Sequence, residues 1–312
     1  GDALRLRQEG LRRDLDLEGT LLHTIEKGGF PSIAYKYATQ PSEYLCLIDE
    51  QSRGSHLGHL FRYLAGSLQQ QDVNLEIYYY RRHFNRFWNA YYPQGRTLDQ
   101  LQRAYGGHRL IVMGDLHDLI NPYARKQPNL RSAYSNVLRQ WSLRLLLTPL
   151  PPVSWSYREK LLARVFNVFP VDYFGLVSAA LHIENDGEIL PDGNAFDRWK
   201  IAQQSIRQDQ DTEHRNWRRW RNIEDYLSAY SPDLVRWFSA LAVFPLPSWE
   251  MTIAIGRKLG VEVSYDNLLR LARIPVLQGD RFDERLRREM LTALSPADEK
   301  LARSAVQAEL SA

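Results

Sequence analysis

Short apolar runs alternate with segments of helical periodicity in the middle of the chain, and this alternation constrains the fold most. The apolar runs cover residues 44–48, 73–80, 110–113, 143–147 and 165–169. Between the first two, apolar residues recur on one helix face: Leu57, Leu60, Phe61, Leu64 and Leu68. Continuous apolar strands that alternate with helices are typical of a parallel sheet covered on both faces. The sequence therefore predicts an α/β domain with a mainly parallel, Rossmann-like sheet.

Acidic residues follow the first and third of these runs. In an open parallel sheet, ligands gather at the carboxyl ends of the strands. The residues in question are Asp49, Glu50, Asp115 and Asp118. Converging carboxylates suit Mg²⁺, and a pair of them can support metal-assisted hydrolysis. Acidic residues also follow strands as turn formers and helix caps. The structural role is favoured, so no cofactor is expected; a cation site at Asp49, Asp115 and Asp118 is the alternative.

Two basic and aromatic segments are candidate binding surfaces. Residues 81–96 read as a loop at the ligand edge of the sheet, where a protein partner would contact Arg81, Arg82, Phe84, Arg86 and Trp88. The second segment interleaves two tryptophans with Arg215, Arg218, Arg219 and Arg221. It fits a nucleic-acid stripe or an amphipathic helix with its arginines in water. The second interpretation is favoured, because 40 basic and 37 acidic residues leave a net charge of only +3.

Several kinds of site lack support in the sequence. The glycine-rich phosphate loop, the dinucleotide fingerprint and the Gly-x-Ser-x-Gly elbow are absent. His56 and His59 form a weak zinc signal without further spaced ligands. The single cysteine, Cys46, lies inside an apolar run and reads as a small buried residue. A single cysteine, which cannot form an internal disulfide, points to a reducing, cytoplasmic compartment. No apolar run approaches the ~18 residues that span a bilayer.

The two ends of the chain differ from the middle. Residues 2–27 carry leucines at helical spacing, which predicts one or two helices. Residues 184–197 read as a turn-rich linker, and helices are expected to begin after Ser231, Ser248, Ser264 and Ser295. With a small hairpin near residues 276–282, these helices suggest an all-α or winged-helix-like domain. The expected units are 1–40, helical; 41–185, α/β; 186–214, linker; and 215–312, helical.

The order of features resembles a von Willebrand factor A domain. Such domains carry Asp-x-Ser-x-Ser after the first strand and a later Asp at the end of a central strand. Asp49 and Asp115 match those aspartates, whereas Gln51 and Arg53 stand at the serine positions. The resemblance therefore implies an A-like domain whose metal-ion-dependent adhesion site is degenerate.

Over most of its length the chain resembles bacterial multidomain proteins of conflict and signalling systems, some of them retroelement-variable. In these proteins an A-like domain and a winged-helix-like segment precede a formylglycine-generating-enzyme-like or other effector domain. The similar phrases are EYLCLID at 43–49, LLTP at 146–149, WSYRE at 155–159, AVFP at 242–245 and LRREML at 286–291. The resemblance implies a sensing or scaffolding portion whose effector lies beyond Ala312.

These observations favour a non-enzymatic protein-interaction, scaffolding or sensing module of a larger bacterial protein. Its expected partner is a protein or another domain of the same protein, with no membrane contact. A Mg²⁺-dependent, nuclease-like hydrolase that uses the strand-end carboxylates is one alternative. Nucleic-acid binding through the winged-helix-like end is the other. The first residue is Gly rather than Met, which suggests a piece excised from a longer protein.

Overall fold

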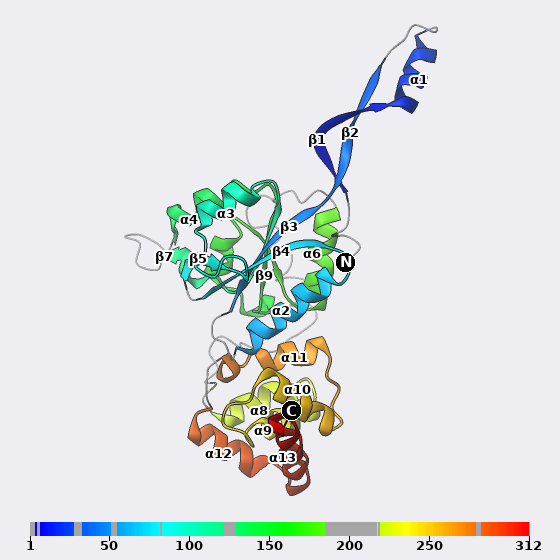
Figure 1. Ribbon diagram of the computed structural model, residues 1–312. Helices are drawn as coiled ribbons and strands as arrows, with labels where there is room; N and C mark the ends of the chain where they lie inside the picture. Colours follow the sequence, from blue (N-terminus) through cyan, green and yellow to red (C-terminus); the bar gives the residue numbers. More distant parts are fainter. Residues whose placement is uncertain are drawn as a thin grey trace.

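A six-stranded sheet forms the centre of the molecule. The computed structural model describes residues 4, 7–27, 33–50, 55–81, 83–121, 129–184, 217, 219–278 and 282–311 (Figure 1). In spatial order the strands are β10 (Asn167–Pro170), β9 (Arg144–Thr148), β6 (Arg109–Met113), β3 (Glu43–Asp49), β4 (Asn74–Arg81) and β5 (His83–Trp88). All neighbours pair in parallel except β5, which runs antiparallel to β4 at one edge. The predicted Rossmann-like, mainly parallel sheet is confirmed.

Helices cover both faces of the sheet. Along β3, Tyr44, Cys46 and Ile48 join the apolar cluster beneath α2 (His56–Gln69) and α6 (Tyr173–Glu184). Leu45 and Leu47 point the other way, as the two-residue period of a strand requires. That opposite cluster includes apolar residues of α3 (Leu98–Tyr105), α4 (Ser132–Leu138) and α5 (Tyr157–Leu162). Burial on both faces explains why the strands read as continuous apolar runs.

The C-terminal region is built from helices. They are α8 (Trp220–Ser228), α9 (Pro232–Leu241), α10 (Trp249–Lys258), α11 (Tyr265–Ala272), α12 (Glu284–Ala293) and α13 (Pro296–Ser311). Each of the four predicted serines accepts a backbone N–H of the helix that follows it, as a capping residue does. The hairpin expected near residues 276–282 is wrong in its first half, because Pro275–Gln278 form a 3₁₀ helix, η4. Residues 279–281 and most of the predicted linker lie outside the described residues.

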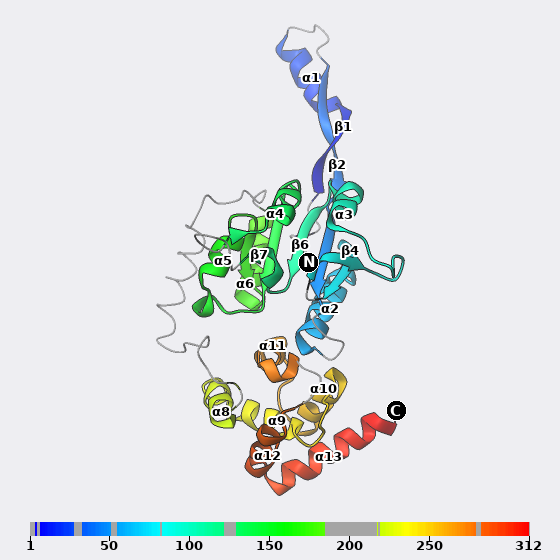
Figure 2. The ribbon, with the colours of Figure 1, turned by 90° about the vertical axis from the view of Figure 1, so that its left-hand side faces the viewer.

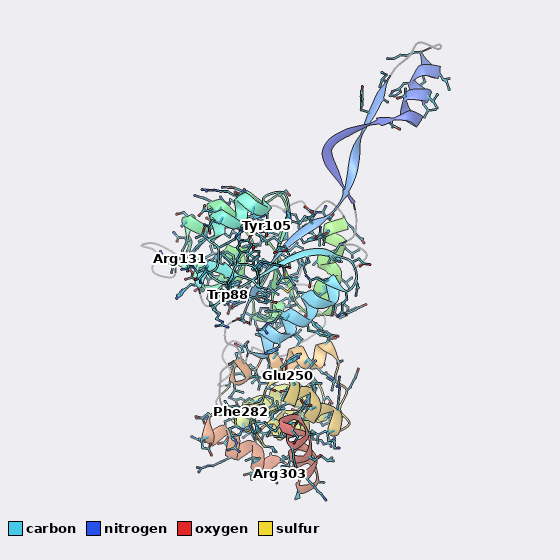
Figure 3. The ribbon with its side chains drawn as sticks, viewed as in Figure 1. Trp88, Tyr105, Arg131, Glu250, Phe282 and Arg303 are labelled. Atoms are coloured by element: carbon cyan, nitrogen blue, oxygen red, sulfur yellow. The ribbon has the colours of Figure 1, made fainter. Side chains whose placement is uncertain are left out.

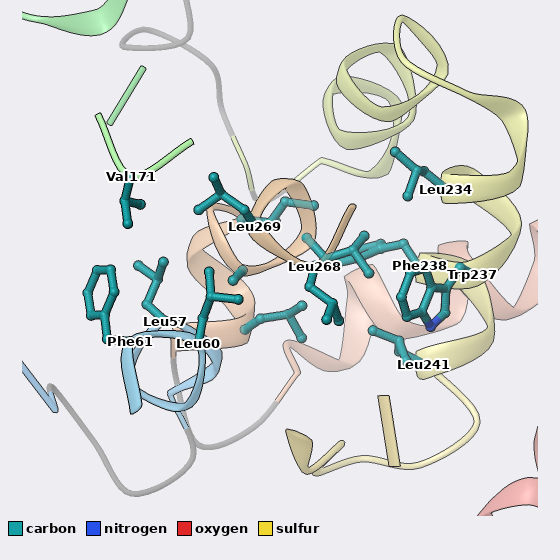
Figure 4. Close-up of a cluster of buried hydrophobic side chains, with 14 of the residues drawn as sticks. Leu57, Leu60, Phe61, Val171, Leu234, Trp237, Phe238, Leu241, Leu268 and Leu269 are labelled. Atoms are coloured by element: carbon teal, nitrogen blue, oxygen red, sulfur yellow. The ribbon is translucent and has the colours of Figure 1, made fainter. Parts of the chain in front are cut away.

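The helical region packs against the carboxyl ends of the strands, on the side where α2 begins (Figures 1 and 2). The Tyr265 hydroxyl donates to the Val171 carbonyl at 2.7 Å, and Arg273 Nε donates to the Pro149 carbonyl at 2.6 Å. One apolar cluster runs from the sheet through Leu57 and Leu60 of α2 to Leu268 and Trp237 (Figure 4). The two regions therefore share one core, and the domain limits expected from the sequence stay predictions.

Two expectations about secondary structure need correction, one at the N-terminus and one after β4. Arg7–Asp16 form a strand, β1, instead of a helix, and β1 pairs antiparallel with β2 (Ala34–Pro41). Only Leu17–Glu26 form the expected helix, α1. The leucine spacing predicted a helix wrongly, because pairing with β2 determines the conformation of β1 more than its local periodicity does. Residues 83–88 were expected to be loop but form β5, whose pairing with β4 is interrupted by a bulge.

The remaining elements are short. A 3₁₀ helix, η2 (His117–Leu119), and a small pair of strands, β7 (Ile120–Asn121) and β8 (Asn129–Leu130), follow β6. A second 3₁₀ helix, η3 (Pro152–Ser154), follows β9. Within the described ranges, no helix is both long and apolar enough to cross a bilayer.

Candidate functional site

The first candidate site lies where the connections of the sheet change direction. The chain leaves β3 through α2 toward β4 on one side, and leaves β6 through α4 toward β9 on the other. Such a switch point is where open α/β sheets form a ligand crevice. Asp49 ends β3, and Gly114 and Asp115 follow β6. The sequence thus placed these two aspartates correctly at one edge of the sheet.

Gly114 allows unusually close approach at this point. A Cβ on Gly114 would lie 2.7 Å from the Asp49 Cβ and 2.6 Å from the Tyr80 hydroxyl oxygen. Its φ of 157° also lies in the range that L side chains rarely adopt, so both space and backbone conformation favour glycine here. The non-glycine residue Leu116, two positions on, adopts a left-handed φ of 53°. Close packing and a tight turn together hold the loop after β6 against Asp49.

The Tyr80 hydroxyl is buried between these acids. It has no hydrogen-bond partner among the described residues. Burial raises the pKa of Tyr80 well above its usual value, and the charges of Asp49 and Asp115 raise it further. A buried, unsatisfied hydroxyl is destabilising, by about 1–3 kcal/mol where it has been measured. Tyr80 is therefore an unusual feature of the switch point that sequence reasoning missed, since tyrosine in a strand is ordinary.

Asp115 belongs to a chain of charged contacts. Its Oδ2 lies 3.0 Å from His117 Nε2, and its Oδ1 accepts the His117 backbone N–H at 3.2 Å. Arg158 Nη1 donates to His117 Nδ1 at 3.0 Å, and Arg158 Nη2 pairs with Glu159 at 2.6 Å. Burial raises the pKa of the Asp115 carboxyl, but the contacts with His117 and the charge of Arg158 outweigh it. The pKa of Asp115 therefore lies below its usual value.

The other two predicted acids turn away from the switch point. Glu50 forms ion pairs with Arg62 and with Arg81, the latter at 2.6 Å. Asp118 accepts the backbone N–H of Phe84 at 3.1 Å and lies 3.5 Å from His83 Nδ1. In the part of the chain that the structure describes, no three His, Cys, Asp or Glu side chains are grouped to hold a metal ion. The cation site at Asp49, Asp115 and Asp118 stays a prediction.

The predicted partner-binding segment is mostly part of the sheet. Phe84 is fully buried and packs edge-to-face on Tyr80, so it lies in the core. Arg81 bonds to Glu50, and its guanidinium lies 5.4 Å from the ring centre of the half-buried Trp88. Arg86 is exposed, whereas Arg82 lies outside the described residues. Among the predicted partner-binding residues that the structure describes, Arg86 has an exposed charge and forms no ion pair with another described residue.

Arg86 belongs to a larger basic surface, which we call the β5 arginine surface: Arg86, Tyr92, Gly95, Arg96, Gln100 and Arg103. Five of these, all but Arg86, line a surface depression of about 520 Å³ beside α3. Figure 3 labels Trp88 of β5 and Tyr105 of α3 in the α/β region. The three arginines form no ion pair with any residue that the structure describes.

Local geometry fixes this surface. The backbones of Phe87 and Arg96 exchange two hydrogen bonds, which close the outer edge of β5 at that point. Gly95 has a φ of 76°, and a Cβ there would lie 2.5 Å from Arg86 Cγ. The Arg96 guanidinium lies 3.5 Å from the ring centre of Tyr92, which in turn stacks on Tyr78. Sequence reasoning missed Arg96 and Arg103 because only the turn at Gly95 and the start of α3 bring them beside Arg86.

The remaining candidate residues are the four arginines of the predicted nucleic-acid stripe. Arg215 and Arg218 lie outside the described residues, while Arg219 and Arg221 are exposed. Trp220 is buried and stacks on Phe238. Helix α8 begins at Trp220, so Arg221 lies in the helix, Arg219 at its N-cap and Trp217 in a turn before it.

The two histidines of the weak zinc signal lie at the junction of the two regions. His56 Nδ1 donates to the Leu277 carbonyl at 3.1 Å, and His56 Nε2 lies 2.8 Å from the Thr252 hydroxyl. His59 stacks on Trp249. Both rings therefore contact the helical region and join it to α2.

Comparison with family models, with curated proteins and with solved structures gives no match.

Proposed function

We propose that the chain is a non-enzymatic protein-interaction module, and that its β5 arginine surface binds an acidic segment of a protein partner. The observation that carries this proposal is that Arg96 and Arg103 line one depression and Arg86 lies beside it against Gly95, with no acidic partner among the described residues. An acidic segment supplies the missing counter-charges. Arginine suits this role because its planar group pairs with carboxylates through two parallel hydrogen bonds.

The surface is partly organised before binding. Arg96 is held on the face of Tyr92, and the Arg86 stem lies against Gly95. Side chains that are already restricted lose less rotamer freedom when a partner arrives. Tyrosine and arginine are also the residue types that contribute most often to interface hot spots. These features favour β5 and the start of α3 over other exposed arginines of the chain.

The state of the carboxylates supports binding rather than catalysis. Glu50 is neutralised by Arg62 and Arg81, and Asp118 holds the start of β5 through the Phe84 N–H. Both acids that were candidates for catalysis beside Asp49 and Asp115 therefore have structural partners. We place the α/β region, as part of the proposal, among von Willebrand A-like binding domains of a cytoplasmic bacterial protein. The positions of Asp49 and Asp115 and the buried free thiol of Cys46 support this placement.

Binding of fluorescently labelled poly-glutamate tests the proposal. The triple variant Arg86→Ala, Arg96→Ala, Arg103→Ala is expected to bind about tenfold more weakly or worse, since several surface charges each contribute about 0.5 kcal/mol. A matched control loses three positive charges from the helical region, through Arg257→Ala, Lys258→Ala and Lys300→Ala, all exposed. An equal loss of poly-glutamate affinity in both variants would contradict a specific acidic-peptide surface. So would a DNA oligonucleotide of equal charge that binds the wild type more tightly than poly-glutamate does.

A Mg²⁺-dependent hydrolase is the second candidate, favoured by one observation. Asp49 and Asp115 meet at the switch point beside a buried, unsatisfied Tyr80 hydroxyl. Phosphodiester and phosphomonoester hydrolysis with Mg²⁺ or Mn²⁺ can be measured for the wild type and for Asp115→Asn. Activity that disappears in the variant while folding is retained would establish this candidate in place of the first.

A further inference from the structure

The N-terminal arm ends in a helix whose apolar face is uncovered. The arm consists of β1, β2 and α1 and projects away from the sheet (Figures 1 and 2). On α1, Leu21, Leu22 and Ile25 are 64%, 55% and 72% exposed. Positions 21, 22 and 25 lie within about 100° of one another on a helix, so they form one stripe. A two-stranded ribbon is marginally stable alone, and this one carries its apolar stripe into solvent.

The arm cannot easily bury this stripe on its own body. The eight residues of β2 span roughly 26 Å at about 3.3 Å per residue. Only Ser42 separates β2 from β3, so the ribbon continues directly from the central sheet. This short connection holds α1 away from the α/β region, as Figure 1 shows. Among the described residues no part of the same chain covers the stripe, which leaves a surface on another molecule to do so.

The body of the same chain carries a second uncovered apolar stripe, on α6. Its members are Tyr173, Phe174, Val177 and Leu181, of which Phe174 is 71% exposed and Leu181 52%. These positions also fall within about 100° of helix surface. From Tyr173 to Leu181 the stripe spans eight helical rises, hence about 12 Å, which is within the roughly 15 Å length of the ten-residue helix α1. Contiguous exposed apolar residues of this kind mark interaction sites.

We infer that two copies of the chain form a symmetric dimer by exchanging arms, with α1 of each copy packed on α6 of the other. Each stripe then covers a stripe of similar chemistry. A two-fold axis makes the two contacts identical and closes the assembly, so no surface is left to extend a fibre. This inference uses neither the β5 arginine surface nor the strand-end carboxylates, and so is independent of the proposed function.

The area that the inferred dimer can bury agrees with that of a stable protein–protein interface. If all seven side chains became fully buried, at roughly 100 Å² each, one contact would bury at most about 700 Å² and two contacts about 1,400 Å². Stable protein–protein interfaces bury about 1,200–2,000 Å² in total. One arm contact alone falls below that range, which is why the reciprocal arrangement is preferred over a one-sided one.

Sedimentation and light scattering of matched variants test the inference. The wild type is expected to be a dimer at micromolar concentration. Leu21→Glu with Ile25→Glu on α1, and separately Phe174→Glu with Val177→Glu on α6, should each weaken dimerisation about a hundredfold or more. The control Leu246→Glu with Leu310→Glu changes two apolar residues that are exposed elsewhere, and should dimerise like the wild type. Circular dichroism checks that each variant is folded.

Mixing and cross-linking distinguish this arrangement from others. A mixture of the α1 and α6 variants retains one intact arm contact, so its mixed pair should associate more weakly than the wild type but more strongly than either variant alone. Independently, Leu22→Cys combined with Val177→Cys should give a disulfide-linked dimer, since Cys46 is buried and does not compete. A monomeric wild type, an α6 variant that dimerises normally, or a cross-linked chain without dimer would each overturn the inference.

Discussion

At the scale of single residues, the neighbours of each acid decide what it does. Asp49, Glu50, Asp115 and Asp118 follow strands in the same way, yet two converge and two do not. Glu50 meets arginines from α2 and β4, and Asp118 meets the backbone of β5. Only Asp49 and Asp115 remain together, because Gly114 has no side chain to keep the strands' ends apart. A shared residue type at strand ends therefore does not imply a shared site.

Asp115 gives a prediction about acid stability. Its pKa in the folded protein lies below 3.8, because hydrogen bonds to His117 and the charge of Arg158 outweigh its burial. The folded state therefore favours the carboxylate, and the stabilisation is fully present above the unfolded pKa of about 3.9. It is lost as the pH falls through the folded pKa. The free energy of unfolding of Asp115→Asn should thus be lower than that of the wild type near neutral pH, and the difference should shrink as the pH falls through the lowered pKa of Asp115 in the folded protein.

Urea denaturation at a series of pH values measures this difference. The control is Asp72→Asn, an exposed acid in the turn after α2. A difference between wild type and Asp115→Asn that does not change with pH would show that the charge of Asp115 is not stabilised by its neighbours.

At the scale of elements, the turn between β5 and α3 organises the arginine surface. Gly95 has a left-handed φ of 76° and lies under the Arg86 stem. Gly95→Ala is expected to lower the free energy of unfolding by about 1–2 kcal/mol, since the left-handed conformation is unfavourable for alanine. It should also displace Arg86 and weaken poly-glutamate binding. Gly107→Ala is the control, because a Cβ at Gly107 meets open space. If Gly95→Ala binds poly-glutamate as well as the wild type does, Arg86 is not part of the binding site.

The sequence predicted the elements that local pattern determines. The parallel strands, α2 and the serine-capped helices follow from apolar runs, helical spacing and capping residues. It failed at β1 and β5, which depend on pairing with β2 and β4. In β5 the buried Phe84 and Phe87 are three residues apart, so strict alternation is absent. Asp49 and Asp115 were found because parallel strand ends share an edge. Tyr80, Arg96 and Arg103 were not, because contacts distant in sequence give them their role.

At the scale of the whole molecule, the shared core predicts cooperative unfolding. The apolar cluster is continuous from the sheet to the helical region, and buried His56 bonds across the junction. We expect far-UV circular dichroism and tryptophan fluorescence to report one coincident transition in denaturant. His56→Ala should lower its midpoint, at a cost of about 1–3 kcal/mol for the bonding groups left unsatisfied. Two separate transitions in the wild type would show that the regions unfold independently.

The placement of the binding surface on the whole molecule can be read directly by hydrogen–deuterium exchange with and without poly-glutamate. If the β5 arginine surface binds an acidic segment, protection should concentrate in residues 83–104, which contain β5, the turn at Gly95 and all but the last residue of α3. The loop after β6, which holds Asp115 and His117, should exchange as in the free protein. Protection centred on that loop or on α8, with residues 83–104 unchanged, would contradict binding at the β5 arginine surface.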